Sequence, residues 1–168
     1  MQPIRVAVLT ISDGVASGTR EDTSGAAVAA WARAEGRVLV THEVVSDDAA
    51  DITATLLQLV DDAGAELVVT TGGTGFSPRD VTPEATRAVI EREAPGVAEA
   101  IRAHGTASTP YSVLSRGVAG IRGRAMIVNL PGSTGGVQDG LAVLGPLVVH
   151  AVRLLRGTDT QNHSADGS

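Results

Sequence analysis

Leu67-Val68-Val69-Thr70-Thr71-Gly72-Gly73-Thr74-Gly75-Phe76-Ser77-Pro78-Arg79-Asp80-Val81-Thr82-Pro83-Glu84 is the stretch of sequence that decides the fold. It begins with apolar and β-branched residues, which are typical of a buried strand. It ends with the signals of a helix start, because Thr82 is a good N-cap, Pro83 suits the first helical position and Glu84 favours the positive end of the helix dipole. The stretch therefore predicts a strand, a glycine-rich loop and a helix.

Strands and helices alternate along the rest of the chain. Strands are expected at 4–11, 37–45, 67–71 and 124–130; helices at 25–35, between Asp48 and Gly64, and at 83–94, 97–104 and 137–155, the last interrupted at Gly145-Pro146; and loop at 108–116. This order predicts the α/β class, as a three-layer, doubly wound, mostly parallel sheet with helices on both faces. We expect one domain over residues 1–156 and a polar, disordered tail over 157–168.

The composition excludes several classes of protein. The chain has 168 residues, of which 43% are hydrophobic and 19% charged, a balance that is typical of a single globular domain. Its three aromatic residues are Trp31, Phe76 and Tyr111, so the core must be aliphatic and no stacking platform for single-stranded nucleic acid is expected. A net charge of −6 also disfavours general binding to duplex nucleic acid.

Cysteine and lysine are both absent from the chain. This excludes thiolate nucleophiles, cysteine-based zinc sites, a Walker-A lysine and a Schiff-base lysine. The four histidines have no metal-ligand spacing on one helix, and His42 and His150 are expected to be packing or surface residues. The N-terminus has no signal-peptide pattern and no apolar run reaches about 18 residues, which favours a cytoplasmic protein without a membrane span.

The glycine-rich loop is the strongest functional signal. No Gly-Lys-Ser/Thr follows it, so it is not a Walker-A loop, and Pro78 stands where a dinucleotide fingerprint needs its last glycine. Gly72, Gly73 and Gly75 let backbone N–H groups approach an anion closely. The alternative is a tight turn that only links strand to helix, but the entropic cost of three glycines favours an anion site.

Two aspartates lie near this predicted anion site. Asp80 either forms an Asx turn ahead of Thr82 or, beside a phosphate, binds a magnesium ion. A carboxylate about 4 Å from a phosphate charge is repelled by about 4 kcal/mol at an effective dielectric near 20, so a divalent cation is needed between them. Asp47 follows the second strand at the same sheet edge, where it either caps the next helix together with Asp48 or shares the magnesium ion with Asp80.

Other polar segments end at this edge of the predicted sheet. Ser12-Asp13-Gly14 follows the first strand, and Pro131-Gly132-Ser133 follows the last. Each alone is an ordinary turn, but together they predict a ligand cleft at the carboxyl ends of the strands. Arg79 and Arg116 are candidates to neutralise a phosphate, although single surface arginines are usually solvated.

Four segments resemble the MoaB/Mog family of molybdenum-cofactor biosynthesis, to which the G domain of gephyrin belongs. The segments are Ile11-Ser12-Asp13, the long motif from Thr71 to Ala85, Leu114-Ser115-Arg116-Gly117-Val118-Ala119-Gly120-Ile121-Arg122-Gly123, and Asn129-Leu130-Pro131-Gly132-Ser133. The resemblance runs from about Arg5 to about Leu155. Departures occur at Ser46 and Thr134, where many relatives have proline, and both touch the substrate loops.

This resemblance implies a molybdopterin adenylyltransferase, which uses Mg-ATP to adenylate the terminal phosphate of molybdopterin and releases pyrophosphate. It also implies a homotrimer or hexamer and a molybdate-inserting partner protein. The family's two essential aspartates fall on Asp47 and Asp80, which are also the expected magnesium ligands. The substrate and nucleotide contacts fall on Ser12, Asp13, Gly72, Gly73, Thr74, Gly75, Ser115, Arg116, Pro131, Gly132 and Ser133.

Two other functions stay open from the sequence. One is a molybdopterin-binding module or oligomeric scaffold without turnover, as some MoaB-type relatives are thought to be. The retention of Asp47 and Asp80 favours the enzyme, since a binder gains nothing from two acids beside a phosphate. The other is a molybdate-inserting protein, which the lack of the extra domains of that type disfavours.

Overall fold

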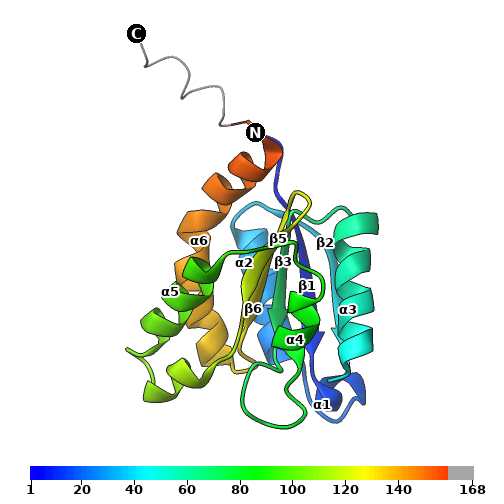
Figure 1. The fold of residues 1–168 in the computed structure, drawn as a ribbon, viewed down its shortest axis with the longest axis vertical. Helices are drawn as coiled ribbons and strands as arrows, with labels where there is room; N and C mark the ends of the chain where they lie inside the picture. Colours follow the sequence, from blue (N-terminus) through cyan, green and yellow to red (C-terminus); the bar gives the residue numbers. More distant parts are fainter. Residues whose placement is uncertain (159–168) are drawn as a thin grey trace.

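A six-stranded sheet organises residues 1–158, which are the residues that the computed structural model describes (Figure 1). The strands are β1 (Arg5–Ile11), β2 (Val38–Val45), β3 (Leu67–Thr71), β4 (Arg92–Glu93), β5 (Ala119–Arg122) and β6 (Ala125–Leu130). The α-helices are α1 (Asp13–Ala16), α2 (Thr23–Ala34), α3 (Ala49–Leu57), α4 (Thr82–Arg87), α5 (Pro95–Gly105) and α6 (Thr134–Arg156); a π-helical turn η1 (Gln58–Asp62) and a 3₁₀ turn η2 (Pro110–Leu114) complete the elements.

The strand order is β2-β1-β3-β6-β5-β4. The first four strands in this order are parallel, with Val6 opposite Leu67 and Leu67 opposite Met126, whereas β5 is antiparallel to both of its neighbours. The carboxyl ends of β1, β2, β3 and β6 therefore meet at one edge of the sheet, as the sequence predicts. The α/β class is confirmed, with a mixed sheet.

Two aliphatic cores cover the two faces of the sheet. Helices α2, α5 and α6 pack on one face, and α3 and α4 pack on the other (Figure 1). The fully buried side chains are mostly valine, leucine and isoleucine, as the scarcity of aromatic residues requires. Trp31 packs at the margin of the first core, with the Arg37 guanidinium 4.2 Å from the centre of its ring.

The helix expected at 83–94 is wrong in its second half. Helix α4 ends at Arg87, and Arg92–Glu93 forms β4 instead, antiparallel to β5. Neither β4 nor β5 is predicted by the sequence, because both are short: β4 has two residues and pairs only with β5, which is distant along the chain, and β5 has four residues and pairs with β4 and with the adjacent β6. The start of α4 also differs, since Val81 is the N-cap and the Thr82 hydroxyl donates to the Gly72 carbonyl oxygen instead.

Helix α6 runs without a break from Thr134 to Arg156, although an interruption is expected at Gly145-Pro146. Proline costs the helix a backbone hydrogen bond, but an apolar stripe on both sides of Pro146 packs in the core and holds the helix together. Its length and hydropathy would also suit a membrane span, yet the face with that stripe is buried against the sheet. Packing in the core accounts for the buried stripe, whereas Leu147, Val149 and Leu154 of the same helix are exposed.

Three other expectations need adjustment. Residues 108–116 contain the turn η2, and Ser12-Asp13-Gly14 leads into the single-turn helix α1, which Ser12 caps. Gly157, at the start of the expected tail, ends α6 in a left-handed conformation with φ of 76°. The rest of the expected tail, 159–168, lies outside the described residues.

Candidate functional site

The glycine-rich loop leaves β3 in a conformation that only glycine tolerates well. Gly72 and Gly73 have φ angles of 97° and 68°. A Cβ atom on Gly72 would lie 2.2 Å from the Ile11 carbonyl oxygen, and one on Gly73 would lie 2.3 Å from the Thr82 hydroxyl oxygen. The loop therefore passes so close to β1 and α4 that both positions require glycine.

The same loop has unused hydrogen-bond donors. The N–H group of Gly72 donates to the Leu130 carbonyl oxygen over 3.1 Å. Within residues 1–158, the N–H groups of Gly73, Thr74 and Gly75 have no acceptor. Successive free amides of this kind form a concave site for an anion.

Arg116 fixes the conformation of the glycine-rich loop through hydrogen bonds to its backbone. Its Nε donates to the Gly75 carbonyl oxygen over 2.9 Å, one terminal nitrogen donates to the Asp80 carbonyl oxygen over 2.8 Å, and the other pairs with the Glu84 carboxylate. Its backbone N–H donates to the Thr74 carbonyl oxygen over 2.7 Å. Arg116 is therefore engaged in shaping the loop, and the structure does not place it in the cavities described below.

Asp47 lies at the end of β2, and its carboxylate faces the loop. It does not cap the next helix, because Asp48 accepts the N–H of Asp51 and is the N-cap of α3. One Asp47 oxygen accepts the backbone N–H of Asp13 over 2.9 Å, and the other would lie 3.1 Å from a Cβ atom on Gly73. Burial raises the pKa of Asp47, and the negative charges of Asp13 and Asp80 raise it further.

Asp80 reaches the loop from the other side. One oxygen accepts the N–H of Ser77 over 2.9 Å and would lie 2.8 Å from a Cβ atom on Gly75. The backbone N–H of Asp80 in turn donates to the Ser77 carbonyl oxygen, so the carboxylate closes the turn that precedes α4. The Asx turn ahead of Thr82 is not what this carboxylate forms.

Arg79 is exposed, but it is paired with a carboxylate and is not a single surface arginine. It binds the Asp13 carboxylate with two nitrogens, at 3.0 and 2.8 Å, and this contact lowers the pKa of Asp13. The loop between β3 and α4 is thereby attached to the end of β1.

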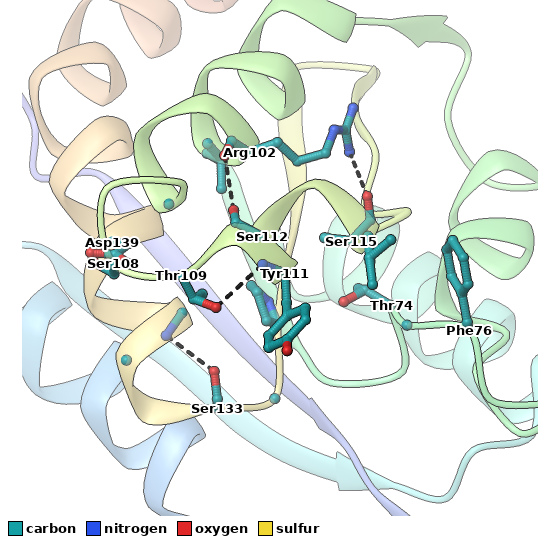
Figure 2. Close-up of a pocket in the computed structure, with 18 of the residues that line it drawn as sticks. Thr74, Phe76, Arg102, Ser108, Thr109, Tyr111, Ser112, Ser115, Ser133 and Asp139 are labelled. Carbon is teal, nitrogen blue, oxygen red and sulfur yellow. Dashed lines mark hydrogen bonds between the residues drawn. The ribbon is translucent and has the colours of Figure 1, made fainter.

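Two cavities meet at this edge of the sheet. The larger cavity, of about 760 Å³, lies between the glycine loop, α5, η2 and the start of α6 (Figure 2). The smaller cavity, of about 310 Å³, lies between the ends of β1, β2 and β3 and the start of α2. Gly73, Asp80, Gly132 and Ser133 line both. The larger one is within the size range of small-molecule sites.

The N-terminus of α6 adds further donors to this junction. Ser133 is the N-cap, and its hydroxyl oxygen accepts the N–H of Gly136 over 3.1 Å. The remaining amides of the first turn have no intrahelical acceptor, and the helix dipole makes this end positive. An anionic group at the junction would therefore meet backbone donors from both the glycine loop and α6.

The two carboxylates suit a divalent metal ion better than any other groups at the junction. Asp47 and Asp80 each have one oxygen engaged with a backbone N–H and one oxygen free of such a contact. Within residues 1–158 no cluster of three or more potential metal-ligating side chains exists. Magnesium commonly takes one or two carboxylates and completes its shell with water and substrate phosphate oxygens, so this donor set fits it.

Most of the predicted site residues come together around the two cavities. The smaller cavity is lined by Ser12, Asp47, Gly72, Gly73, Asp80, Gly132 and Ser133, and the larger one by Gly73, Thr74, Gly75, Asp80, Ser115, Pro131, Gly132 and Ser133. Asp13 and Arg116 line neither cavity, but each forms hydrogen bonds with residues that do.

Arg20 also lines the smaller cavity, and Tyr111 and Asp139 line the larger one, although the sequence does not predict a role for them. These residues lie in a polar loop, a turn and a helix that carry no recognisable motif. The only available signal was that Tyr111 is one of three aromatic residues and stands in a segment with no apolar pattern.

The chain is similar to known proteins over most of its length. The family model described as a probable molybdopterin binding domain matches residues 7–150. The chain is 36% identical over 166 residues to the molybdopterin adenylyltransferase of Helicobacter pylori, covering 96% of this chain and 93% of that protein. It is 38% identical over 156 residues to the Drosophila melanogaster molybdenum cofactor synthesis protein cinnamon, covering 92% of this chain but only 26% of that longer protein.

A solved structure shows the same fold. The molybdopterin biosynthesis enzyme MoaB from Thermus thermophilus superposes with a TM-score of 0.86 at 43% identity, covering 92% of this chain and 97% of that one. Its agreement extends over almost the whole of both chains, so the similarity is not confined to a motif. Together with the family match over residues 7–150, this places the chain in the molybdopterin binding domain family, with the MoaB and Mog proteins of molybdenum-cofactor biosynthesis.

Proposed function

We propose that this protein is a molybdopterin adenylyltransferase. The observation that carries the proposal is the position of Asp80 and of the free Gly73 amide where the two cavities adjoin, with the Asp47 carboxylate beside Gly73 in the wall of the smaller cavity. Two adjoining cavities suit a reaction between two substrates, and the junction is where their phosphates would meet. The Helicobacter pylori relative, which aligns over nearly its full length, carries the name of this activity.

The proposed reaction transfers an adenylyl group. A terminal phosphate oxygen of molybdopterin attacks the α-phosphorus of ATP, the bond from that phosphorus to the oxygen bridging to the β-phosphate breaks, and pyrophosphate leaves. The protein's part is positioning and charge neutralisation, and no covalent enzyme intermediate is needed. The amides of Gly73, Thr74 and Gly75 and the first turn of α6 would hold phosphate oxygens.

Asp47 and Asp80 would hold magnesium at the junction. The ion, when bound, would neutralise charge on the phosphates and draw them towards the carboxylates that otherwise repel them. Burial raises the pKa of the Asp47 carboxylate, so a cation bound beside it would stabilise the ionised form. The cytoplasmic location, the homotrimer or hexamer and the molybdate-inserting partner remain predictions from the sequence.

The test is direct turnover. The protein is mixed with molybdopterin, ATP and magnesium, and pyrophosphate and the adenylated pterin are measured. We expect Asp47→Asn and Asp80→Asn to lower kcat at least about 100-fold while nucleotide affinity changes only a few-fold, because the carboxylates act mainly in the transition state. Asp62→Asn is the matched control, since Asp62 is exposed and lies outside both cavities.

If the wild type and Asp80→Asn both bind molybdopterin but neither releases pyrophosphate, the adenylyltransferase proposal is refuted and the protein is a binding module or scaffold. Equal losses of affinity and rate in the two variants would instead show that the carboxylates only bind substrate.

A further inference from the structure

Asp139 is a carboxylate without a partner in the wall of the larger cavity. It lies in the second turn of α6 and is half-buried. Within residues 1–158 its side chain makes no hydrogen bond or ion pair. Arg102 lines the same cavity, but its guanidinium donates to the carbonyl oxygens of Ser115 and Gly117. A half-buried carboxylate in a cavity wall whose oxygens accept no hydrogen bond from the described residues is available to accept hydrogen bonds from a ligand.

Two aromatic rings line the same cavity. Phe76 and Tyr111 are 71% and 74% exposed, and they are two of the three aromatic residues in the chain. Figure 2 shows Tyr111 between Phe76 on one side and Asp139 on the other. Exposed rings contribute little to the core, whereas the face of an aromatic ring favours contact with another flat ring. The cavity therefore offers surface for a planar heterocycle as well as a carboxylate for its edge.

We propose that Asp139 is a specificity-determining residue, whose carboxylate accepts hydrogen bonds from two adjacent N–H groups on one edge of a planar heterocycle in the larger cavity. A pterin has such an edge in its N3–H and 2-amino groups. Adenine lacks it, because its corresponding edge places an amino donor beside a nitrogen acceptor. Asp139 would thus direct the pterin to the larger cavity and exclude the adenine of ATP from it. The assignment of a pterin rests on the proposed function.

Two probes that differ at one position test this pairing. Lumazine carries an oxygen where pterin carries the 2-amino group, so it presents only one donor to the carboxylate. Their affinities are measured by calorimetry for the wild type, for Asp139→Asn and for the matched control Asp62→Asn. We expect the wild type and the control to bind pterin at least about 10-fold more tightly than lumazine, because a hydrogen bond to a charged group contributes strongly to binding.

In Asp139→Asn the preference for pterin over lumazine should fall to less than about 3-fold, since an amide can accept at one atom only. Asp139→Ala provides a second variant with the same expected loss. The preference is a ratio measured within each protein, so a general loss of folding does not imitate it. An unchanged preference in both variants would overturn the proposal.

Guanine has the same pair of adjacent N–H donors as a pterin, so guanosine tests which of these two heterocycles the cavity prefers. Tighter binding of guanosine than of pterin by the wild type would overturn the assignment of a pterin. These measurements need neither ATP nor turnover. If the wild type forms adenylated pterin but Asp139→Asn prefers pterin over lumazine as strongly as the wild type does, the proposed function stands and this inference is refuted. If the protein shows no turnover but its preference for pterin depends on Asp139, this inference stands and the proposed function is refuted.

Discussion

The backbones and side chains of Asp13 and Asp47 bind each other reciprocally. The Asp13 N–H donates to the Asp47 carboxylate over 2.9 Å, and the Asp47 N–H donates to the Asp13 carboxylate over 3.0 Å. This exchange joins the ends of β1 and β2 and fixes the Asp47 side chain opposite Gly73. Asp13 is therefore a positioning residue for Asp47, although it lines neither cavity.

Arg79 extends this arrangement to the glycine loop, and its loss should weaken turnover more than stability. We expect Arg79→Gln to lower kcat about 10-fold, because the loop that carries Asp80 is no longer attached to Asp13. The melting temperature should stay close to that of the wild type, since the pair is exposed. Arg79→Lys should recover only part of the rate, because lysine has no two-pronged contact.

The same variant has a titration signature. Arg79 is the main cause of the lowered pKa of Asp13. In Arg79→Gln the pKa of Asp13 should rise towards its ordinary value, which an NMR titration of the side-chain carboxyl carbons measures. An Asp13 carboxyl that titrates identically in both proteins would show that the two side chains do not pair in solution.

We expect the ionised Asp47 carboxylate to lower the stability of the fold at neutral pH. Its raised pKa means that the folded state holds the proton more tightly than the unfolded state, so the ionised carboxylate destabilises the fold at neutral pH. Without magnesium, Asp47→Asn should therefore be more stable than the wild type at pH 7. The advantage should shrink as the pH falls through the folded pKa of Asp47 towards the ordinary value of 3.8. Urea denaturation at several pH values measures it.

The control for this prediction is Asp62→Asn, at an exposed position outside both cavities, whose stability is measured at the same pH values. An Asp47→Asn variant that is less stable than the wild type at pH 7 would mean that the contact with the Asp13 N–H outweighs the cost of burial.

The sequence predicted the parallel half of the sheet and the edge of the sheet at which the candidate site residues come together. Strands β1, β3 and β6 are buried, largely aliphatic runs, whereas β2 is only half-buried and is indicated by its β-branched, partly alternating residues. Local composition does not identify β4 and β5, because β4 has two exposed residues and exists only by pairing with β5. The helical pattern after Thr82 continued past Arg87 in the sequence, but the pairing of Arg92 and Glu93 ended the helix.

The glycine loop and its two aspartates were predictable because clustered glycines and acids at strand ends rarely serve packing alone. Asp139 and Tyr111 were not, because each is a single residue whose meaning depends on what lies opposite. The alternatives for Asp47 likewise needed the structure, which shows that Asp48 and not Asp47 caps α3. Residues that act through a shared cavity carry no signal in their own neighbourhood of the chain.

The pair of Glu66 and Arg156 joins the start of β3 to the end of α6 and should stabilise the fold above acidic pH. Two nitrogens of Arg156 bind the two Glu66 oxygens at 2.6 and 2.8 Å, and each side chain is only 17% exposed. Glu66→Gln should lower the free energy of unfolding by about 1–3 kcal/mol at pH 7, as expected for a hydrogen-bonded charge pair that is largely buried. Glu99→Gln, at an exposed position in α5, is the control.

The pH dependence of this pair has the opposite sign to that of Asp47. Arg156 lowers the pKa of Glu66, so the stabilisation is present above the ordinary value of 4.5 and is lost as the pH falls through the lower folded value. The difference between wild type and Glu66→Gln should therefore disappear in acid. A difference that persists unchanged at pH 2 would attribute it to packing and not to charge.

Gly73 should be the position where the loop tolerates a side chain least. Its φ of 68° is unfavourable for alanine, and the new Cβ would lie 2.3 Å from the hydroxyl oxygen of Thr82, which donates to the Gly72 carbonyl oxygen. Gly73→Ala should lower the free energy of unfolding by about 1–3 kcal/mol and should also abolish turnover, because the amides at the junction move. Gly96→Ala is the matched control: Gly96 lies in α5 with open space around it, and alanine there should stabilise the helix by up to about 1 kcal/mol. A Gly73→Ala variant as stable and as active as Gly96→Ala would mean that the loop is not held in this conformation, and the free amides could then not serve as a fixed anion site.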